Sequence, residues 1–300
     1  MVSGGDLTVD NLLEQNRLYS TEVVALFETK NNSRKYRYLK RRLGMSCMYA
    51  IEPRGIAGGM CVFWRDANDL VLVKYGDFFI EVLIEDGVRH FKWRSVVVYA
   101  CTDERKRTQQ FEVLLTRLAG YTEPCLLMGD FNDLLLDSEK DRENDRSVAS
   151  MRAFRNFVAY ASLLDLGFEG YSYTWRNIQE EGFIQERLDC ALATHDWVQS
   201  YQQAIVKHME LEGSDHVMLV LSTEVNQPRH LMHNLRKVKH RLVTWQKNEG
   251  HNEQKEICRL KEVLRVAYQQ SVFDGNWILG LEEELTRAFR REEIVWRTKS

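Results

Sequence analysis

The feature of this chain that most constrains its fold is a series of short apolar runs, each followed by a polar or glycine-containing turn. The runs are rich in β-branched and aromatic residues and are too short for buried helices, so they predict β-strands. They lie at Glu22–Phe27, Met60–Trp64, Leu70–Tyr75, Phe78–Ile84, Ser95–Tyr99, Pro124–Met128 and Val217–Leu221. The tripeptide Glu85-Asp86-Gly87 predicts a hairpin turn between two of these strands.

Three segments between these runs carry apolar residues at helical spacing instead. They are Leu7–Leu18, Thr102–Leu118 and Ser150–Leu164, and either Thr102 or Asp103 would cap the second helix. Many strands with few helices between them predict two packed sheets flanked by helices, since a parallel α/β fold would alternate strand and helix throughout.

The character of the chain changes near residue 226, where glycine becomes scarce and charged residues become more frequent. Apolar residues then recur at helical spacing in two series: Ile257, Leu260, Leu264 and Ala267, followed by Ile278, Leu281, Leu285 and Phe289. We therefore expect residues 1–225 to form the main domain and residues 226–300 to form an α-helical tail, folded as a helical hairpin.

Composition narrows the classes of function. The net charge of -3 gives no general support for nucleic-acid binding, so any such binding must come from local basic patches. The six cysteines form no C-x-x-C pair, which argues against a zinc knuckle or a redox dithiol. No segment approaches the roughly 18 apolar residues that span a bilayer, and the N-terminus has no signal-peptide pattern. Several cysteines lie in apolar runs, as buried thiols of a reducing compartment do. We therefore expect an intracellular protein, in the nucleus or cytoplasm, and we also expect a monomer.

Two polar clusters directly follow predicted strands. Glu28 would lie at the rim of a sheet, where a carboxylate can bind Mg²⁺; otherwise it is a surface glutamate beside Lys30. The string Gly129-Asp130-Phe131-Asn132 contains a glycine that permits a tight exit from the strand. Asp130 and Asn132 can then point to the same side and orient a water and a phosphate oxygen, although an Asx turn would use the same residues.

Two further clusters lie beside later strands. In Arg187-Leu188-Asp189 the alternation of a strand would place Asp189 opposite Leu188, either in a site or facing solvent. Ser214-Asp215-His216 enters the last strand, and an aspartate beside a histidine there suits metal binding or general acid chemistry, or forms a polar turn. Together the clusters supply the residue types that hydrolysis of a phosphate ester requires, namely ligands for a metal ion and groups that position a water.

A basic segment follows the first cluster. Lys30–Arg42 contains seven basic residues and no acid, with Tyr36 and Tyr38 interleaved. It could bind a DNA backbone beside Glu28, or it could be the solvated face of a helix. A second basic run, Arg236–Arg241, is a weaker pattern of the same kind.

The ordered set of four clusters resembles the endonuclease/exonuclease/phosphatase superfamily, which has the four-layered fold of pancreatic deoxyribonuclease and apurinic-site repair endonucleases. Two details resemble the endonuclease domain of plant LINE-type (non-LTR) retrotransposons: Tyr171–Trp175, and Arg54–Trp64 with its Gly58-Gly59 pair. That resemblance covers about residues 6–223, and Glu292–Arg297 resembles the segment that precedes the reverse transcriptase in those elements.

The resemblance implies an α+β fold, a four-layered α/β/β/α sandwich of two packed mixed sheets followed by the α-helical tail. It implies metal-dependent phosphodiester hydrolysis with Mg²⁺, or Mn²⁺ in its place. The partner would be DNA, and in the parent element a reverse transcriptase domain would follow.

The resemblance also implies roles for the residues around the metal and the water. Glu28 would bind the metal, and Asp215 would lie beside the metal or the leaving group. Asp130 would activate or orient the attacking water. Asn132 would hold the substrate phosphate and Asp130.

Further roles concern the phosphate and the DNA. Asp189 would orient His216, which would stabilise the negative charge on the phosphate. Tyr99 matches a phosphate-contacting tyrosine. Trp175 would lie near the DNA-facing rim or belong to the core, and Lys30 and Arg34 would bind substrate.

One departure from the family concerns the start of the chain. The family opens with a strand whose Asn contacts the metal site, whereas this chain begins Met1–Asp6 and continues at once with a predicted helix. We therefore expect a domain that lacks its first strand and is truncated at both ends, with an exposed sheet edge and reduced activity and stability.

Three functions follow from these patterns. The clusters favour a DNA-nicking endonuclease derived from a retrotransposon. The missing first strand favours a catalytically inactive remnant or binding module. A phosphatase acting on a small or lipid phosphate would use the same fold, but the basic segment argues against it.

Overall fold

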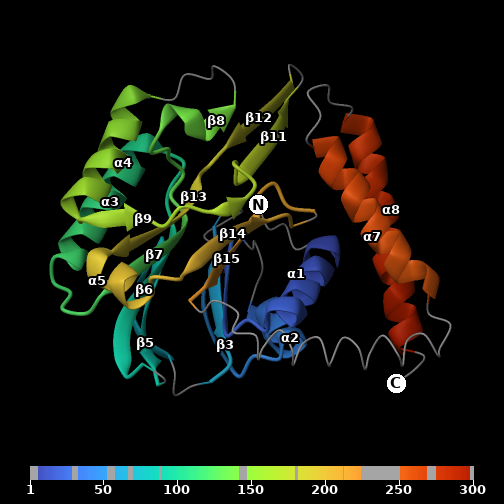
Figure 1. Ribbon diagram of the computed structural model, residues 1–300, viewed down its shortest axis with the longest axis horizontal. Coiled ribbons are helices and arrows are strands. Elements are labelled where there is room, and N and C mark those ends of the chain that lie inside the picture. Colours follow the sequence, from blue (N-terminus) through green and yellow to red (C-terminus); the bar gives the residue numbers. More distant parts are fainter. Residues whose placement is uncertain are drawn as a thin grey trace.

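The arrangement of strands follows from which face of each strand is apolar. The computed structural model describes residues 6–28, 33–52, 58–66, 70–87, 89–141, 147–179, 182–211, 213–223, 251–268 and 275–297. In this part of the chain two β layers pack face to face, with helices on both outer sides (Figure 1). The predicted α/β/β/α sandwich of two packed mixed sheets with C-terminal helices is confirmed.

The first layer is a six-stranded sheet. Its strands, in spatial order, are β4 (Leu70–Gly76), β5 (Phe79–Asp86), β6 (Phe91–Tyr99), β7 (Cys125–Asp130), β13 (Asp189–Thr194) and β9 (Leu163–Asp165). β6 and β7 are parallel and the other neighbours are antiparallel. The parallel pair needs a crossover, which is supplied by helix α3 (Glu104–Leu118).

The second layer consists of two three-stranded sheets. One has the order β1 (Val23–Phe27), β3 (Met60–Trp64), β2 (Cys47–Ile51), and the other β10 (Glu169–Gly170), β14 (Ile205–Met209), β15 (Met218–Ser222). A third small sheet, β11 (Trp175–Gln179), β12 (Gly182–Glu186) and β8 (Lys140–Asp141), extends beyond the sandwich.

Both halves of the second layer pack against the same face of the first. Side chains alternate along β6, so Trp93 and Val97 point toward this interface while Val96 and Val98 point the other way. Val97 packs in the cluster that includes Met60 and Val62 of β3, and Trp93 packs in the cluster that includes Val206 of β14. The two three-stranded sheets therefore share one apolar interface with the six-stranded sheet.

Helices cover the two outer faces. α3 and α4 (Val148–Tyr160) cover the six-stranded sheet, where the rings of Phe111 and Phe154 stack with centroids 5.2 Å apart. The short helix α5 (His195–Ser200) follows β13. α1 (Asp6–Tyr19) and α2 (Ser33–Leu43) cover β1 and β3 through a cluster that includes Leu12, Leu39 and Phe63.

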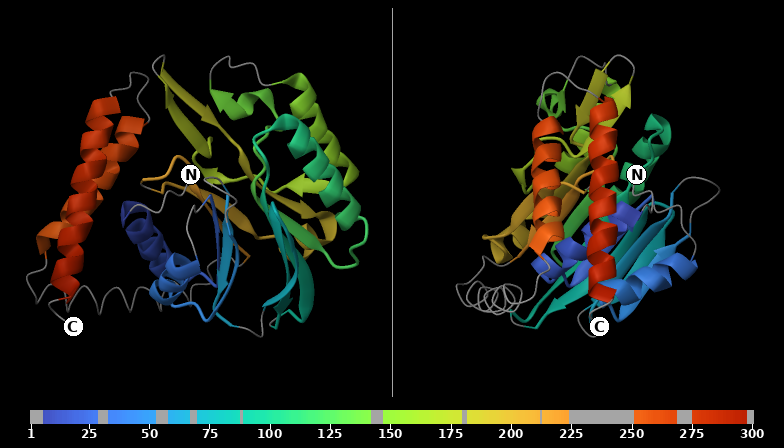
Figure 2. Two further views of the ribbon diagram at one scale, coloured as in Figure 1. Left: turned by 180° about the vertical axis from the view of Figure 1, so that it is seen from behind. Right: turned by 90° about the vertical axis from the view of Figure 1, so that its right-hand side faces the viewer.

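The C-terminal residues form the predicted helical hairpin. α7 (His251–Tyr268) and α8 (Gly275–Arg297) lie side by side (Figure 2), next to α1 and on the opposite side of the sandwich from α3 and α4. Their contact surface contains the residues of the two predicted apolar series. The domain boundary near residue 225 stays a prediction, because it lies outside the described residues. No described helix is long and apolar enough to cross a membrane.

Three predicted boundaries were wrong. The helix predicted over Ser150–Leu164 ends at Tyr160, because Ser162 has a positive φ of 51° and Leu163 pairs with Thr194 as the start of β9. β6 begins at Phe91, well before the predicted Ser95, because its first residues pair with β5. The turn between β5 and β6 also begins later than the predicted tripeptide, because Glu85 and Asp86 pair with Lys92 and Phe91 as the end of β5.

The edges of the second layer bear on the predicted absence of a first strand. Among the described residues, β1 pairs with β3 alone and β15 pairs with β14 alone. The described residues do not test whether the family's first strand is missing, so its absence stays a prediction. The basic run Arg236–Arg241 also lies outside them.

Gly129 generates a first prediction, because β7 and β6 approach closely at this residue. Its φ is +144°, and an added Cβ would lie 2.0 Å from the carbonyl oxygen of Val98. We expect Gly129→Ala to lower the free energy of unfolding by about 3–5 kcal/mol in urea denaturation, because the two strands must separate.

Gly280, in α8, supplies the matched control, because a Cβ there meets nothing within 4 Å. Gly280→Ala should stabilise the protein by about 0.5–1 kcal/mol through helix propensity. A Gly129→Ala protein as stable as the wild type would contradict the close approach of the strands.

His208 generates a second prediction, on the pH dependence of stability. Burial lowers its pKa, while the hydrogen bond of its Nδ1 to the Tyr171 carbonyl partly opposes this. The unfolded chain therefore binds a proton that the folded protein excludes, so stability is present above about pH 6.5 and is lost as the pH falls.

We expect His208 to contribute a slope of up to about 1.4 kcal/mol per pH unit below pH 6.5. His208→Gln should flatten this slope in urea denaturation at several pH values between neutral and about 5. Identical slopes for the two proteins would show that His208 is already protonated or already solvated in the fold.

Candidate active site

The end of the β6–β7–β13 segment brings the candidate residues together. Tyr99 is the register partner of Asp130 across the parallel pair, and Asp189 is the register partner of Asp130 on the other side. Asp130 is the last residue of β7, whereas Asp189 is the first of the antiparallel β13, so both carboxylates lie at one rim. Asp130 and Asp189 are only 4% and 5% exposed, so the solvent-facing alternative for Asp189 is wrong.

Asn132 is held against Asp130. Its side-chain Nδ2 donates to Asp130 Oδ2 at 2.9 Å and to the Ala100 carbonyl at 2.9 Å, while its backbone N donates to Asp130 Oδ1 at 2.8 Å. The φ of Asn132 is 52°, a left-handed conformation that asparagine tolerates better than most residues. The turn is thus an Asx turn, and it also fixes the carboxylate in one orientation.

His216 pairs with the second carboxylate. Its Nδ1 lies 2.9 Å from Asp189 Oδ2, and its Nε2 lies 4.0 Å from Asp130 Oδ2. Its backbone N donates to Ser214 Oγ at 3.0 Å. Asp189 therefore fixes the ring orientation and directs Nε2 toward Asp130.

Glu28 joins the site through Tyr99. The Tyr99 hydroxyl donates to Glu28 Oε1, and Glu28 itself has a positive φ of 47° directly after β1. The pKa of Tyr99 is raised, first by burial and then by the hydrogen bond and charge of Glu28 and the charge of Asp130. Tyr99 therefore stays protonated at neutral pH and acts as a donor.

The electrostatics of the site favour a positive charge. Burial, and then the neighbouring Asp189 carboxylate, raise the pKa of Asp130 to about 7. For His216, burial lowers the pKa but the carboxylates of Asp189 and Asp130 outweigh it, so the net shift is upward. A cation between the carboxylates would oppose the repulsion that raises the pKa of Asp130.

The donor set fits a divalent metal ion. One ligand atom from each of Asp130, Asp189 and His216 lies within 4.8 Å of the others. Several of these atoms are already engaged with Asn132 or with one another. A hard cation such as Mg²⁺ takes one or two carboxylates and keeps several waters, which suits this partly engaged set.

The remaining predicted residues take different positions. Asp215 is half-buried beside His216, and its carbonyl accepts from the backbone N of Arg176. Trp175 packs partly buried in the cluster that includes Leu134 and Leu188, so part of its ring serves the core. Arg34 is exposed in the first turn of α2, and Lys30 lies outside the described residues.

Thr174 was missed by the sequence interpretation. It is fully buried, and its Oγ1 accepts hydrogen bonds from the backbone N atoms of Leu188 and Asp189, both at 2.9 Å. It therefore fixes the start of β13, which carries Asp189. The Tyr-Ser-Tyr-Thr-Trp string was noted only for its family resemblance, and no local pattern indicated that this hydroxyl would face β13.

A buried ion pair behind the site was also missed. Arg107 Nε donates to Asp133 Oδ2 at 3.0 Å, and Ser150 Oγ donates to the same oxygen at 2.5 Å. Arg107 also donates to the Cys101 and Thr102 carbonyls. The turn after Asp130 is therefore anchored to both α3 and α4.

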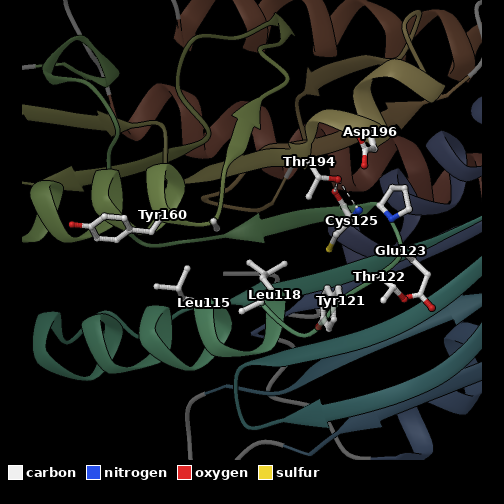
Figure 3. Close-up of a pocket in the computed structure, with 12 residues that line it drawn as sticks. Leu115, Leu118, Tyr121, Thr122, Glu123, Cys125, Tyr160, Thr194 and Asp196 are labelled. Atoms are coloured by element: carbon white, nitrogen blue, oxygen red, sulfur yellow. Dashed lines mark hydrogen bonds between the residues drawn. The ribbon is translucent and has the colours of Figure 1, made fainter.

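A cavity in the structure lies away from this site. It encloses about 230 Å³ at the C-terminal ends of α3 and α4 (Figure 3). It reaches Cys125, the first residue of β7, whereas Asp130 is the last. Its lining residues are Leu115, Leu118, Ala119, Tyr121, Thr122, Glu123, Pro124, Cys125, Tyr160, Ala161, Thr194 and Asp196.

The sandwich and the rim of carboxylates, amide and imidazole define a class of protein, the phosphoesterases, since these groups can bind a metal and position water. The chain belongs to the Endonuclease/Exonuclease/phosphatase family, whose model matches residues 2–216. A search of curated proteins finds no match. The predicted resemblance to this family is confirmed.

Solved structures share the fold at low sequence identity. The endonuclease domain of TRAS1, a telomere-specific non-LTR retrotransposon, has 15% identity and a TM-score of 0.54, covering 74% of this chain and 95% of that one. An AP endonuclease from Archaeoglobus fulgidus has 15% identity and a TM-score of 0.57, with coverage of 72% and 94%. The 3'-5' exonuclease NExo from Neisseria meningitidis has 18% identity and a TM-score of 0.53, with coverage of 72% and 95%.

Thr174 generates a third prediction. Thr174→Val keeps the shape of the side chain but leaves the two buried backbone amides of Leu188 and Asp189 without an acceptor. We expect a loss of about 2–4 kcal/mol in the free energy of unfolding, measured by urea denaturation.

Thr174→Ser is the control, because it retains the hydroxyl and should lose only about 1 kcal/mol for the missing methyl group. If the valine and serine variants were equally stable, the hydroxyl would not be holding β13.

Proposed function

We propose that the chain is a metal-dependent phosphodiesterase that nicks DNA, related to retrotransposon endonucleases. The observation that carries this proposal is the meeting of two hydrogen-bonded pairs, Asp130 with Asn132 and Asp189 with His216, at one rim. Glu28 is joined to the same rim through Tyr99, the register partner of Asp130. These residues come from separate parts of the chain and meet at one rim. Structural ion pairs do not require an amide and an imidazole at such a rim, whereas a hydrolase of phosphodiesters can use both to orient a carboxylate and to stabilise charge on the phosphate.

Each residue has a role that its contacts suit. Asp130, held by Asn132, orients the attacking water and accepts its proton. Asp189 keeps His216 in the orientation that directs Nε2 toward the phosphate, whose developing negative charge the imidazole stabilises. Tyr99 donates a hydrogen bond at the same rim. Asn132 holds the Asp130 carboxylate, and it would bind a phosphate oxygen by giving up its hydrogen bond to the Ala100 carbonyl.

The metal is part of the proposal. Glu28 and Asp215, with the nearby carboxylates, would hold Mg²⁺ or Mn²⁺, which supplies charge neutralisation at the phosphate. Neither ion is distinguished by the donor set, because both accept carboxylate oxygen and water.

The basic face of α2 favours a polyanionic substrate over a small phosphate. α2 contains no acidic residue and begins close after Glu28 in sequence, and Arg34, Arg37 and Arg41 are exposed along it. A DNA backbone offers repeated phosphates to such a basic surface, whereas an inositol phosphate would not need it. NExo from Neisseria has been solved with a product DNA hairpin, which lends the DNA proposal further support.

The fourth prediction tests this function on supercoiled plasmid with Mg²⁺. We expect nicking that EDTA abolishes, and a fall of about 10²–10⁴-fold for Asp130→Ala and for His216→Ala. Asp196→Ala is the matched control, because Asp196 is exposed on α5 beside the cavity at the other end of β7.

Two other results would replace the proposal. A folded protein that binds but does not nick DNA would be the inactive binding module predicted as an alternative. A protein that turns over inositol phosphates and not DNA would be a phosphatase.

A further inference from the structure

The helical hairpin packs against the side chain of Arg176 in β11. The guanidinium carbon of Arg176 lies 3.6 Å from the centre of the Tyr268 ring at the end of α7. The Tyr268 hydroxyl in turn donates to Glu282 Oε1 on α8 at 2.5 Å. Arg176 is therefore stacked on a ring whose orientation both helices of the hairpin fix.

A second set of contacts surrounds the same arginine. Glu210, which follows β14, is half-buried and interacts with Arg176, with the Tyr171 hydroxyl and with Arg265 of α7. Lys261 of α7 also forms an ion pair with Glu14 of α1. The hairpin thus contacts the sandwich through opposite charges and a stacked ring, as well as through its neighbour α1.

Arg176 follows Trp175 in β11, and Trp175 lies opposite His216 of the candidate site. Its backbone N donates to the Asp215 carbonyl at 2.9 Å, and the Val217 backbone N donates to the Thr174 carbonyl at 2.8 Å. Between these two bonds, Trp175 and His216 form an isolated antiparallel bridge. This short ladder attaches the segment that carries His216 to β11, and the segment continues at Met218 into β15, which pairs with β14.

The ladder between β11 and the His216 segment is short, so side-chain contacts outside it can affect how often it opens. Two backbone hydrogen bonds join β11 to the residues just before β15, and so short a ladder opens locally more easily than a continuous sheet. Thr174 fixes one end through β13, and Arg176 is the residue at the other end. An anchor on the Arg176 side chain would therefore hold the ladder closed.

We propose that the α7–α8 hairpin is a positioning element for the candidate active site, with Tyr268 acting through Arg176 to hold the segment Ser214–Val217 and thereby His216. Its catalytic consequence rests on the proposed function, whereas the mechanical coupling does not. Tyr268 and Arg176 are positioning residues, because neither contacts the candidate catalytic groups through its side chain. The tail then belongs to the enzyme and is more than a connector.

The fifth prediction is made on the full chain and reads hydrogen exchange at the backbone amides of Arg176 and Val217. Tyr268→Leu removes the ring, and we expect both amides to exchange about tenfold faster. Tyr268→Phe keeps the ring and should restore exchange to near the wild-type rate. Tyr160→Leu, on the exposed face of α4, is the control and should change neither amide.

Arg176→Gln tests the same contact without altering the core of the hairpin. It should reproduce the faster exchange at Val217, so a general loosening of the helices in Tyr268→Leu cannot account for both results. Unchanged exchange in Arg176→Gln, or equal exchange in the leucine and phenylalanine variants, would overturn the proposal.

The nicking assay supplies the catalytic readout. We expect kcat for Tyr268→Leu to fall about tenfold with little change in KM, and Tyr268→Phe to recover it. A wild-type protein that does not nick DNA would end the proposed function, and the exchange results would still decide the positioning role. An active Tyr268→Leu protein with normal kcat but faster exchange would overturn the catalytic consequence.

Discussion

The close approach of β6 and β7 at Gly129 is the constraint on which the site depends. Only a residue without a Cβ lets the Val98 carbonyl lie against β7 at this position. The approach keeps Tyr99, Asp130 and Asp189 in register across three neighbouring strands. One backbone contact thus determines that a phenol and two carboxylates reach the same rim.

Buried carboxylates in this fold have two kinds of partner. Glu81 pairs with Arg94 and Arg117, Asp133 with Arg107, and Glu139 with Arg187, so their charges are neutralised inside the structure. In the part of the chain that the structure describes, Asp130 and Asp189 have no arginine partner. They lie opposite each other on neighbouring strands, and Asp130 contacts an amide while Asp189 contacts an imidazole. Burial together with like charge raises the pKa of Asp130. The negative charge of these two carboxylates is therefore not neutralised by an arginine side chain, and a bound metal ion would neutralise it.

The supporting contacts come from every layer of the sandwich. Arg107 and Ser150 hold the turn after β7 from the helices on one side, and Thr174 holds the start of β13 from the small sheet that contains β11. The helical hairpin reaches the segment around His216 from the opposite side through Arg176. The candidate groups are therefore positioned by side chains that take no part in the chemistry, as preorganisation of a site requires.

The sequence by itself determined strands β1, β3 to β7 and β15, most of the helices and the residue types of the site, whereas β2, β8 to β12 and β14 were not predicted. Short apolar runs, helical apolar series and four polar clusters are local patterns, because each reflects the burial or exposure of one element. They were sufficient for the sandwich, the helical hairpin and the family. The end of α4 could not be predicted from a local pattern, because the pairing of Leu163 with Thr194 overrides the helical pattern there.

Only the tertiary structure decided which contacts between distant elements position the site. The division of the second layer into two sheets, the link from Glu28 to the site through Tyr99, the hydroxyl of Thr174 and the ring of Tyr268 against Arg176 all join residues that are distant in the chain. Such contacts depend on the relative placement of whole elements, which the energetics of one segment do not specify. The residues of the site can therefore be proposed from the sequence, whereas the contacts that hold them in place have to be observed.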